Sequence, residues 1–315
     1  MVNIADMSKK VAVMDLGTNT FHLVIAEGDA ANPTILYKTT EPTKIGEGGI
    51  NKGVIIPEAY ARGIKALQQF KMQIHENGAT EVKAMATSAL RNASNGKDFI
   101  SQVKAETGIT IDIIDGEDEA GYIYQGVKVS GCLSDNNSLI IDIGGGSIEF
   151  ILCNKETIFF KQSFEIGAAR MMDKFHRTDP IDEASITKLH QFLDEALISL
   201  FTIASRHRIN NLVGSSGSFE TFACIAEQQK GNSLDILTTK TYTFKPEEFV
   251  KATDYLIQST HQQREENKAI APVRVDMIVV SSIITRFVMN KLNVTEVTMT
   301  TNSLKEGVLA DMLCN

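Results

Sequence analysis

Two segments of this sequence share one pattern that suits phosphate chemistry. In residues 11–25 and again in residues 138–152, an apolar run ends in an aspartate, a short turn rich in glycine and hydroxyl side chains follows, and a second apolar run begins. Consecutive backbone N–H groups in such a turn form a concavity that binds anions, and glycine permits close approach and positive φ. The predicted phosphate contacts are Gly17, Thr18, Asn19 and Thr20 in the first turn (residues 17–20) and Gly144, Gly145, Gly146 and Ser147 in the second turn (residues 144–147).

An ordinary tight hairpin is the alternative explanation for either turn taken alone. Glycine loses much conformational entropy on folding, however, so three consecutive glycines between two strands are costly for a plain hairpin. The duplication, with Asp15 before the first turn and Asp142 before the second, favours phosphate binding.

A third candidate, the third loop (residues 214–218), follows an apolar strand and opens a helix. Helix N-termini bind anions through their unpaired N–H groups and the helix dipole. A serine that only caps the helix is the alternative. Beside the two turns, phosphate contact by Ser216, Gly217 and Ser218 is the favoured interpretation.

Two carboxylates flank the second turn. Asp142 ends one predicted strand, and Glu149 lies in the returning strand, where alternation sends it to the face opposite its apolar neighbours. Mg²⁺ prefers one or two carboxylates together with water and phosphate oxygens, so the pair predicts a magnesium site. The alternatives are that Asp142 only caps the turn and that Glu149 faces solvent.

Further charged groups are candidates for the same site. Glu117, Asp118 and Glu119 open a helix, where the helix dipole favours acids; one of them facing the site could serve as general base on water. Arg91 follows another strand, and its planar fork suits phosphate oxygens, although a surface arginine is the alternative. His22 occupies the register of Glu149 in the repeat, so it is expected either to face the site or to be a core histidine.

Other patterns are missing from the sequence. The six histidines lack metal-ligand spacing, no zinc motif is present, and no GxxxxGK[ST] segment indicates a Walker-type ATPase.

These residues need strands and helices to position them. In the first half we expect strands at 10–15, 20–27, 34–39, 81–86 and 109–114 and helices at 57–76, 95–107 and 117–130. In the second half we expect strands at 138–143, 147–153, 157–164, 210–214 and 294–299 and helices from 167 and at 182–206, 217–229, 246–260, 273–291 and 303–313. Three antiparallel strands followed by alternating helix and strand, twice over, predict an α/β duplication with ligands at the carboxyl ends of strands.

Composition limits the partners. The 315 residues suffice for two domains, and 43% hydrophobic with 22% charged residues is typical of a globular protein. A net charge of −8 disfavours nucleic-acid polymers as partners. Four cysteines without CxxC spacing, a polar start and no long apolar run predict a cytoplasmic protein without membrane segments.

Taken together, the motifs resemble the exopolyphosphatase/guanosine pentaphosphate phosphohydrolase (Ppx/GppA) family in its short two-domain form. That family belongs to the actin-like ATPase superfamily, whose members have two ribonuclease-H-like lobes with a cleft between them. The matching elements occur in family order and cover nearly the whole chain: residues 15–22, 86–91, 116–120, 142–149, 166–170, 214–217 and 303–307.

The resemblance implies an architecture and a set of roles. Residues 1–128 with 301–315 would form the N-terminal lobe and residues 129–300 the C-terminal lobe, with the crossing near 127–137. Glu119 would activate water, Asp142 and Glu149 would hold Mg²⁺, and the turns with Arg91 would hold successive phosphates.

The reaction implied is Mg²⁺-dependent hydrolysis of the terminal phosphate of inorganic polyphosphate. A pppGpp 5′-phosphohydrolase and a non-catalytic (p)ppGpp-binding sensor are the alternatives, and a superfamily kinase is a further rival. The sequence leaves open whether K⁺ assists and whether the chain forms a homodimer.

The sequence departs from the family pattern at several positions. Asp118 stands where Glu is usual, Ser215 where Ala is usual, and His22 where some members have Arg, while Ser303 and Lys305 stand where Gly and Arg are frequent. The extra C-terminal domains of larger members, which help to bind long polymers, have no counterpart in these 315 residues. We therefore expect a preference for short polyphosphate or a nucleotide polyphosphate.

Overall fold

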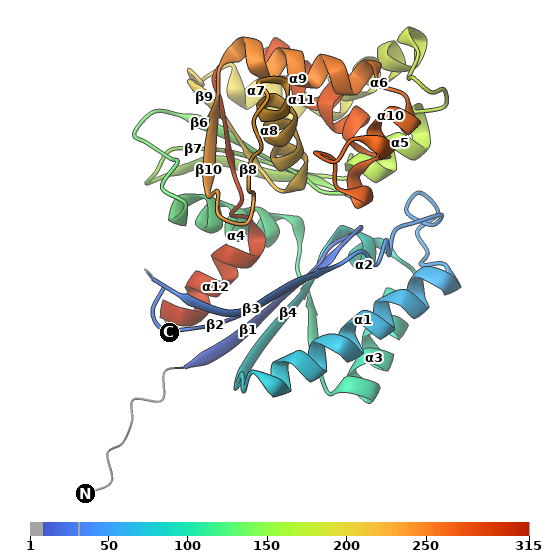
Figure 1. Cartoon of the computed structure of the whole chain (residues 1–315), viewed down its shortest axis with the longest axis vertical. Coiled ribbons are helices and arrows are strands. Elements are labelled where there is room, and N and C mark those ends of the chain that lie inside the picture. Colours follow the sequence, from blue (N-terminus) through green and yellow to red (C-terminus); the bar gives the residue numbers. More distant parts are fainter. Residues whose placement is uncertain (1–8, 31, 315) are drawn as a thin grey trace, which may run out of the picture. The chain divides into compact units, whose positions relative to one another are not determined.

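The computed structural model describes residues 9–30 and 32–314 (Figure 1). These residues form two compact units: the described residues up to Asp115 together with those from Leu304 onward, and Gly116–Ser303. The division differs from the expected lobes in residues 116–128 and 301–303, which belong to the second unit. Helix α4 (Gly116–Val129) packs on strands β7 (Ile148–Cys153) and β8 (Ile158–Phe164) of that unit.

A five-stranded sheet forms the centre of the first unit. Its strand order is β3-β2-β1-β4-β5, with bounds β1 Lys10–Leu16, β2 Phe21–Glu27, β3 Thr34–Glu41, β4 Glu81–Ala86 and β5 Ile111–Ile113. The first three strands are antiparallel, whereas β4 runs parallel to β1 and β5 parallel to β4.

The helices of the first unit are α1 Pro57–Glu76, α2 Ser88–Asn92, α3 Gly96–Thr107 and α12 Leu304–Cys314. Helix α1 begins with Pro57, whose missing N–H costs nothing in a first turn, and it buries Leu67 and Phe70 in a core with the strand residues Met14 and Phe21. Helix α12 contacts β1 and β2.

The second unit repeats this arrangement and adds one edge strand. Its order is β10-β11-β9-β6-β7-β8, with β6 Ser138–Ile143, β9 Asn211–Ser215, β10 Thr241–Phe244 and β11 Val297–Thr300. Without β10, the order and directions match those of the first sheet. The predicted α/β duplication is therefore confirmed.

Helices cover the second sheet, and their bounds are α5 Ala168–Phe175, α6 Glu183–Ala196, α7 Ile198–Ala204, α8 Gly217–Gln229, α9 Pro246–Gln258, α10 His261–Glu266, η1 Pro272–Arg274 and α11 Ile278–Leu292. Alternation places Ile148 and Phe150 of β7 in the main core. Glu149 and Ile151 point to the other face of the sheet.

Several expected elements differ from those observed. The helix expected at 182–206 is two helices, α6 and α7, which meet at Leu197 with φ −101° and ψ 17°. The helix expected at 273–291 begins at Ile278, after η1. Helices α2 and α10 and strand β10 were not expected, because such short elements show too few residues for a period to emerge.

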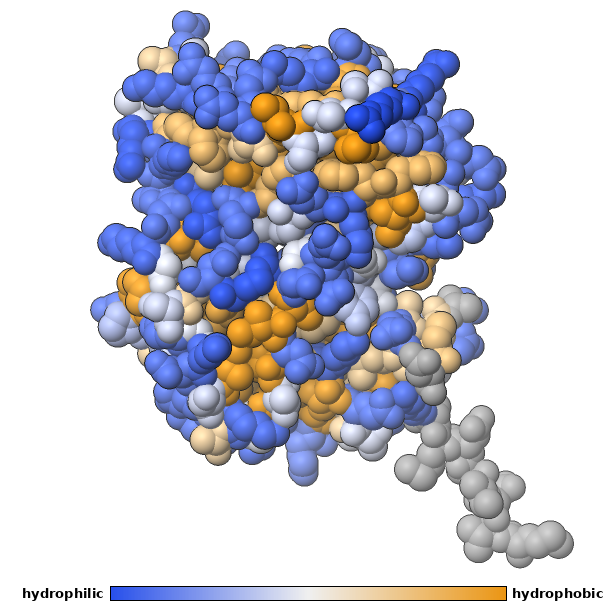
Figure 2. All heavy atoms as spheres, turned by 180° about the vertical axis from the view of Figure 1, so that it is seen from behind, coloured by the Kyte–Doolittle hydropathy of each residue, from blue (hydrophilic) through white to orange (hydrophobic). Residues whose placement is uncertain are grey.

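The surface is ordinary for a globular chain. In Figure 2, hydrophilic side chains prevail on the face shown and apolar ones stand between them, as on most protein surfaces. No helix within the described ranges combines the length and apolar character that a membrane span requires.

Candidate active site

The two turns lie in hairpins of identical register. Asp15 of β1 pairs with His22 of β2, and Asp142 of β6 pairs with Glu149 of β7. The equivalence of His22 and Glu149 expected from the repeat is thus confirmed.

The second turn is held from one side by the start of α5. The N–H groups of Gly167, Ala168 and Ala169 donate to the carbonyl oxygens of Gly146, Gly144 and Gly145 at 3.1, 2.9 and 3.0 Å. These bonds turn the carbonyls of the glycine run toward α5. Within the described chain, the N–H groups of Gly145 and Gly146 meet no acceptor, which leaves them available to an anion.

Glycine matters at this turn because it has no side chain, and not because it permits an unusual backbone angle. The described glycines with positive φ do not include Gly144, Gly145 or Gly146, so the positive φ that glycine permits is not used here. A Cβ on Gly167 would lie 2.4 Å from backbone atoms of Gly145 and Gly146, so α5 can approach the turn only because glycine occupies that position.

The first turn is built in the same way with different partners. The N–H of Gly17 donates to the Thr20 carbonyl at 3.1 Å, and the N–H groups of Lys44 and Gly46 donate to the carbonyls of Asn19 and Thr18 at 2.8 and 3.1 Å. Internal donors therefore take the carbonyls of this turn as well.

Three carboxylates meet in the second unit. The relative solvent exposure is 7% for Asp142, 2% for Glu149 and 7% for Glu119. This burial excludes the solvent-facing alternative for Glu149. Burial raises the pKa of the Glu149 carboxyl well above its usual range, and the charges of Glu119 and then Asp142 raise it further. Ser163 and Ser147 oppose this shift by hydrogen bonding.

This donor set suits a hard divalent cation. A cation beside Asp142 and Glu149 would offset the repulsion between buried carboxylates, and Mg²⁺ needs only one or two of them. In the described ranges, no group of three or more His, Cys, Asp or Glu residues has the arrangement of metal ligands. An ion held by Asp142 and Glu149 alone would need its other ligands from water and phosphate.

One of the three acids in the first turn of helix α4 is buried. Glu117 and Asp118 are exposed, whereas Glu119 is buried and interacts with Glu149. The helix starts close to the sheet, since a Cβ on Gly116 would lie 2.3 Å from the Cβ of Ser163.

The third loop joins β9 to α8 in the same unit. Ser216 has φ 68° and ψ 179°, a backbone region that is strained for any residue but glycine, and its hydroxyl donates to the Ile143 carbonyl at 3.3 Å. Such strain persists only where surrounding structure enforces it, and it clusters at functional sites.

Arg274 also lies at the third loop, although nothing in the sequence around it marks it. An ideal Cβ on Gly217 would lie 2.1 Å from its guanidinium, so the group sits against the start of α8. Its Nη2 donates to Glu220 at 2.8 Å. The contact joins residues far apart in the sequence, and only the fold reveals it.

Arg91 and the first turn belong to the first unit. Helix α2 follows Thr87, whose N–H donates to the Leu16 carbonyl at 3.4 Å, so the helix begins beside the end of β1. Arg91 donates from Nη1 to the Ile114 carbonyl at 3.0 Å. The second unit thus gathers Glu119, both metal candidates, the second turn and the third loop, while the first unit holds the first turn and Arg91.

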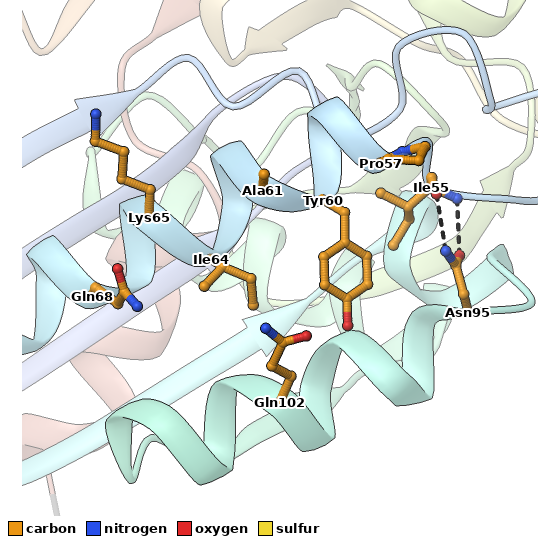
Figure 3. A pocket seen from close by; sticks show the side chains of 9 residues that line it. All are labelled: Ile55, Pro57, Tyr60, Ala61, Ile64, Lys65, Gln68, Asn95 and Gln102. Carbon is orange, nitrogen blue, oxygen red and sulfur yellow. Dashed lines mark hydrogen bonds between the residues drawn. The ribbon is translucent and has the colours of Figure 1, made fainter.

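A groove of about 520 Å³ between α1 and α3 contains none of these residues (Figure 3). Its walls are mainly apolar, with Tyr60 at the centre. At its rim, Gln68 and Gln102 donate to Glu106, and Asn95 bonds the backbone of Ile55 (dashed lines in Figure 3). The groove lacks the convergent acids that hydrolysis requires.

Comparison with known proteins assigns the family. Residues 24–315 match the Ppx/GppA phosphatase family. The structure is similar to the crystal structure of an exopolyphosphatase from Cytophaga hutchinsonii, with 36% identity, a TM-score of 0.93 and coverage of 97% of this chain and 98% of that one.

Two relatives in sequence carry different names. Exopolyphosphatase 1 of Mycobacterium tuberculosis is 25% identical over 95% of this chain and 87% of its own length. The guanosine-5′-triphosphate,3′-diphosphate pyrophosphatase of Pseudoalteromonas translucida is 29% identical over 77% of this chain, and the match spans 48% of that protein.

The two α/β units, with buried acids beside a glycine turn in the second, have the fold of that exopolyphosphatase structure. This chain belongs to the Ppx/GppA phosphatase family. The resemblance, the fold class and the class of enzyme, a phosphoric anhydride hydrolase, are thereby confirmed.

Proposed function

We propose that this chain is an exopolyphosphatase that removes the terminal phosphate of inorganic polyphosphate with the help of Mg²⁺. The observation that carries the proposal is the group of buried carboxylates Glu119, Asp142 and Glu149 next to a turn with two N–H groups, those of Gly145 and Gly146, that meet no acceptor among the described residues. The similarity to exopolyphosphatases from two organisms supports it.

In this proposal the residues divide the work of phosphoryl transfer. Asp142 and Glu149 would hold Mg²⁺, which would supply positive charge for the phosphate oxygens. The N–H groups of Gly145 and Gly146 bind oxygens of the terminal phosphate. Glu119 orients a water molecule and accepts its proton as the water oxygen forms a bond to the terminal phosphorus. The P–O bond to the bridging oxygen breaks, and the shortened polyphosphate leaves with that oxygen. Most of the acceleration comes from positioning and charge neutralisation.

Hydrolysis of the 5′-γ-phosphate of pppGpp is the second candidate. The relative from Pseudoalteromonas translucida favours it, because its name describes a guanosine polyphosphate substrate. Both reactions break a terminal phosphoanhydride bond, so the carboxylates and the second turn would serve either one. A preference for short chains and a cytoplasmic location stay predictions from the sequence.

Phosphate release decides between these substrates. We expect release from polyphosphate in the presence of Mg²⁺ and little release when EDTA is added. Faster release from pppGpp would select the second candidate, and tight guanosine-polyphosphate binding without release would select a sensor. Phosphorylation of a sugar or acetate by ATP would instead indicate a kinase. A rate that rises clearly with polymer length would refute the preference for short chains.

Glu119→Gln tests the assigned base. Removing a general base costs about 10²–10⁴-fold in rate. We expect a loss in kcat on this scale with substrate binding retained. Glu117→Gln is the matched control, because this neighbouring acid of the same helical turn is exposed. Near-normal turnover of Glu119→Gln would refute the assignment.

A further inference from the structure

The two proposed metal ligands lie in one row that crosses four neighbouring strands. Ser215 of β9 pairs with Asp142 of β6, Asp142 pairs with Glu149 of β7, and Glu149 pairs with Ser163 of β8. Partners in register project to the same face of a sheet. The row therefore reads serine, carboxylate, carboxylate, serine.

Each serine donates to the carboxylate beside it. Ser163 Oγ lies 2.6 Å from Glu149 Oε1, and Ser215 Oγ lies 2.7 Å from Asp142 Oδ2. Such bonds are shortest and strongest when the carboxylate is ionised, which is the state that would hold a cation. Ser215 is fully buried, so water does not compete for its hydroxyl; the Asn302 carbonyl, at 3.2 Å from the same Oγ, is the more distant of its two acceptors.

Ser163 has a second contact that bears on Glu119. If Gly116, the first residue of α4, carried a Cβ, that atom would lie 2.3 Å from the Cβ of Ser163. The side chain that bonds Glu149 thus also sets how close α4 approaches the sheet. A change at Ser163 would act on Glu149 directly and on Glu119 through the helix.

We propose that Ser163 and Ser215 are positioning residues that fix the orientation of the Glu149 and Asp142 carboxylates for binding a divalent cation. The inference rests on the proposed function. The terminal torsion of a carboxylate side chain is broad, so each hydrogen bond to one of its oxygens narrows the orientations that it samples. A hydroxyl bonded to one oxygen fixes the direction of the other, which lowers the cost of ordering the ligands when the cation binds. The competing explanation is that the serines only satisfy buried acids and stabilise the sheet.

The test compares Ser163→Ala and Ser215→Ala with two controls that also lose a serine hydroxyl. Ser199→Ala removes a hydroxyl that donates to Gln162 Oε1 at 2.9 Å, and Gln162 directly precedes Ser163 in the chain. Ser282→Ala removes a fully buried hydroxyl that donates to the Ile278 carbonyl at 2.8 Å. Ser215→Cys is a second variant that keeps the volume but donates weakly. Mn²⁺ binding without substrate, followed by electron paramagnetic resonance, gives a readout apart from turnover.

We expect each of Ser163→Ala and Ser215→Ala to raise the Mg²⁺ concentration for half-maximal phosphate release by about 10-fold, since partners of metal ligands typically contribute 10–100-fold. Mn²⁺ binding should weaken by the same factor, with kcat at saturating Mg²⁺ reduced less. Ser215→Cys should follow Ser215→Ala, and the controls should match the wild type.

Unchanged Mg²⁺ and Mn²⁺ dependence in the two alanine variants would overturn the inference, as would equal losses in the controls. A wild-type protein that neither binds Mn²⁺ nor responds to Mg²⁺ would also overturn it. If the wild type releases no phosphate but the alanine variants still lose Mn²⁺ affinity, the proposed function fails while the positioning role is supported.

Discussion

The hairpin of β1 and β2 and the hairpin of β6 and β7 occupy the same place in their sheets, but the rows that cross them carry different side chains. In the second unit the row reads Ser215, Asp142, Glu149 and Ser163. In the first unit the corresponding residues are Met85, Asp15, His22 and Thr40. Only the aspartate is the same residue in both rows.

The outer hydroxyl is also kept, although its partner has changed. Thr40 Oγ1 lies 2.9 Å from His22 Nδ1, just as Ser163 donates to Glu149. His22 Nε2 in turn lies 2.9 Å from Thr20 Oγ1 in the first turn. The duplicated scaffold thus supports a pair of carboxylates in one unit and a carboxylate with an imidazole in the other. Function lies in the side chains placed on a fold and not in the fold itself.

Glu149→His replaces the Asp–Glu pair of the second row by the Asp–His pair found in the first row. It is the most severe test of the comparison. The variant replaces a carboxylate that is proposed to hold Mg²⁺, and such charge stabilisation is worth several kcal/mol, or about 10³-fold in rate. We expect a loss of phosphate release on this order that additional Mg²⁺ does not restore. His22→Glu is the reciprocal control in the first unit and should leave the Mg²⁺ dependence nearly unchanged. Equal losses from both changes would show that the two rows do not differ as described.

Gly167→Ala tests how the second turn is held. The new Cβ would meet backbone atoms of Gly145 and Gly146 at 2.4 Å, which cannot move away as a flexible side chain can. We expect a rate loss of about 10–100-fold from the displaced N–H groups and a destabilisation of about 1–3 kcal/mol, measured by urea unfolding.

Gly46→Ala is the corresponding change at the first turn. Its Cβ would meet the Thr18 side chain at 2.5 Å, so a side-chain rotation can relieve part of the clash. The loss should be smaller than for Gly167→Ala, and a larger one would contradict the comparison.

Local patterns in the sequence reveal the hairpins and the long helices. The apolar runs that end at Asp15 and Asp142, the glycine-rich turns and Pro57 at the start of α1 all act within a few residues, so a reader of the sequence can find them. The register of the repeat follows from the equal spacing of Asp15 to His22 and of Asp142 to Glu149 in the sequence. These features carry the resemblance to the Ppx/GppA family, and the family match confirms it.

Contacts between distant segments are what the sequence does not show. Glu119 differs from Glu117 and Asp118 only because α4 turns one side toward β7 and β8. The polar, glycine-containing stretch after α4 suggests a boundary there, yet these same contacts group α4 with the second unit. The pairings of Ser163 and Ser215 and the contact of Arg274 with Gly217 likewise need the register of strands and the packing of helices.

Glu149→Gln tests the stability of the fold, and its expected effect is smaller than those above. Because the pKa of Glu149 is raised in the folded state, the fold binds this proton more tightly than the unfolded chain does. The resulting stability is fully present below the ordinary carboxylate pKa and is lost as pH rises through the raised value. At neutral pH without divalent cations, Glu149→Gln should therefore melt at a higher temperature than the wild type, where about 2–4 °C corresponds to 1 kcal/mol.

Two conditions sharpen this prediction. Well below the ordinary carboxylate pKa the difference in melting temperature should vanish, because the wild-type carboxyl is then protonated in both states. Added Mg²⁺ should stabilise the wild type more than the variant, since a ligand that binds only the folded state raises stability. Glu156→Gln, at an exposed position in the same unit, should show neither effect. A variant less stable than the wild type at neutral pH would contradict the repulsion among the three acids.

His22→Asn is the smallest change and probes the first row alone. The variant loses the imidazole that links the hydroxyls of Thr20 and Thr40, and each such hydrogen bond contributes about 0.5–1.5 kcal/mol. We expect a destabilisation of about 1–2 kcal/mol with the Mg²⁺ concentration for half-maximal activity unchanged. Thr40→Val removes one of these two bonds with little change in shape and should show about half of the effect. If either variant shifted the Mg²⁺ dependence as Ser163→Ala is expected to do, the first row would share in cation binding, and the contrast between an acidic pair and an acid–imidazole pair would lose its meaning.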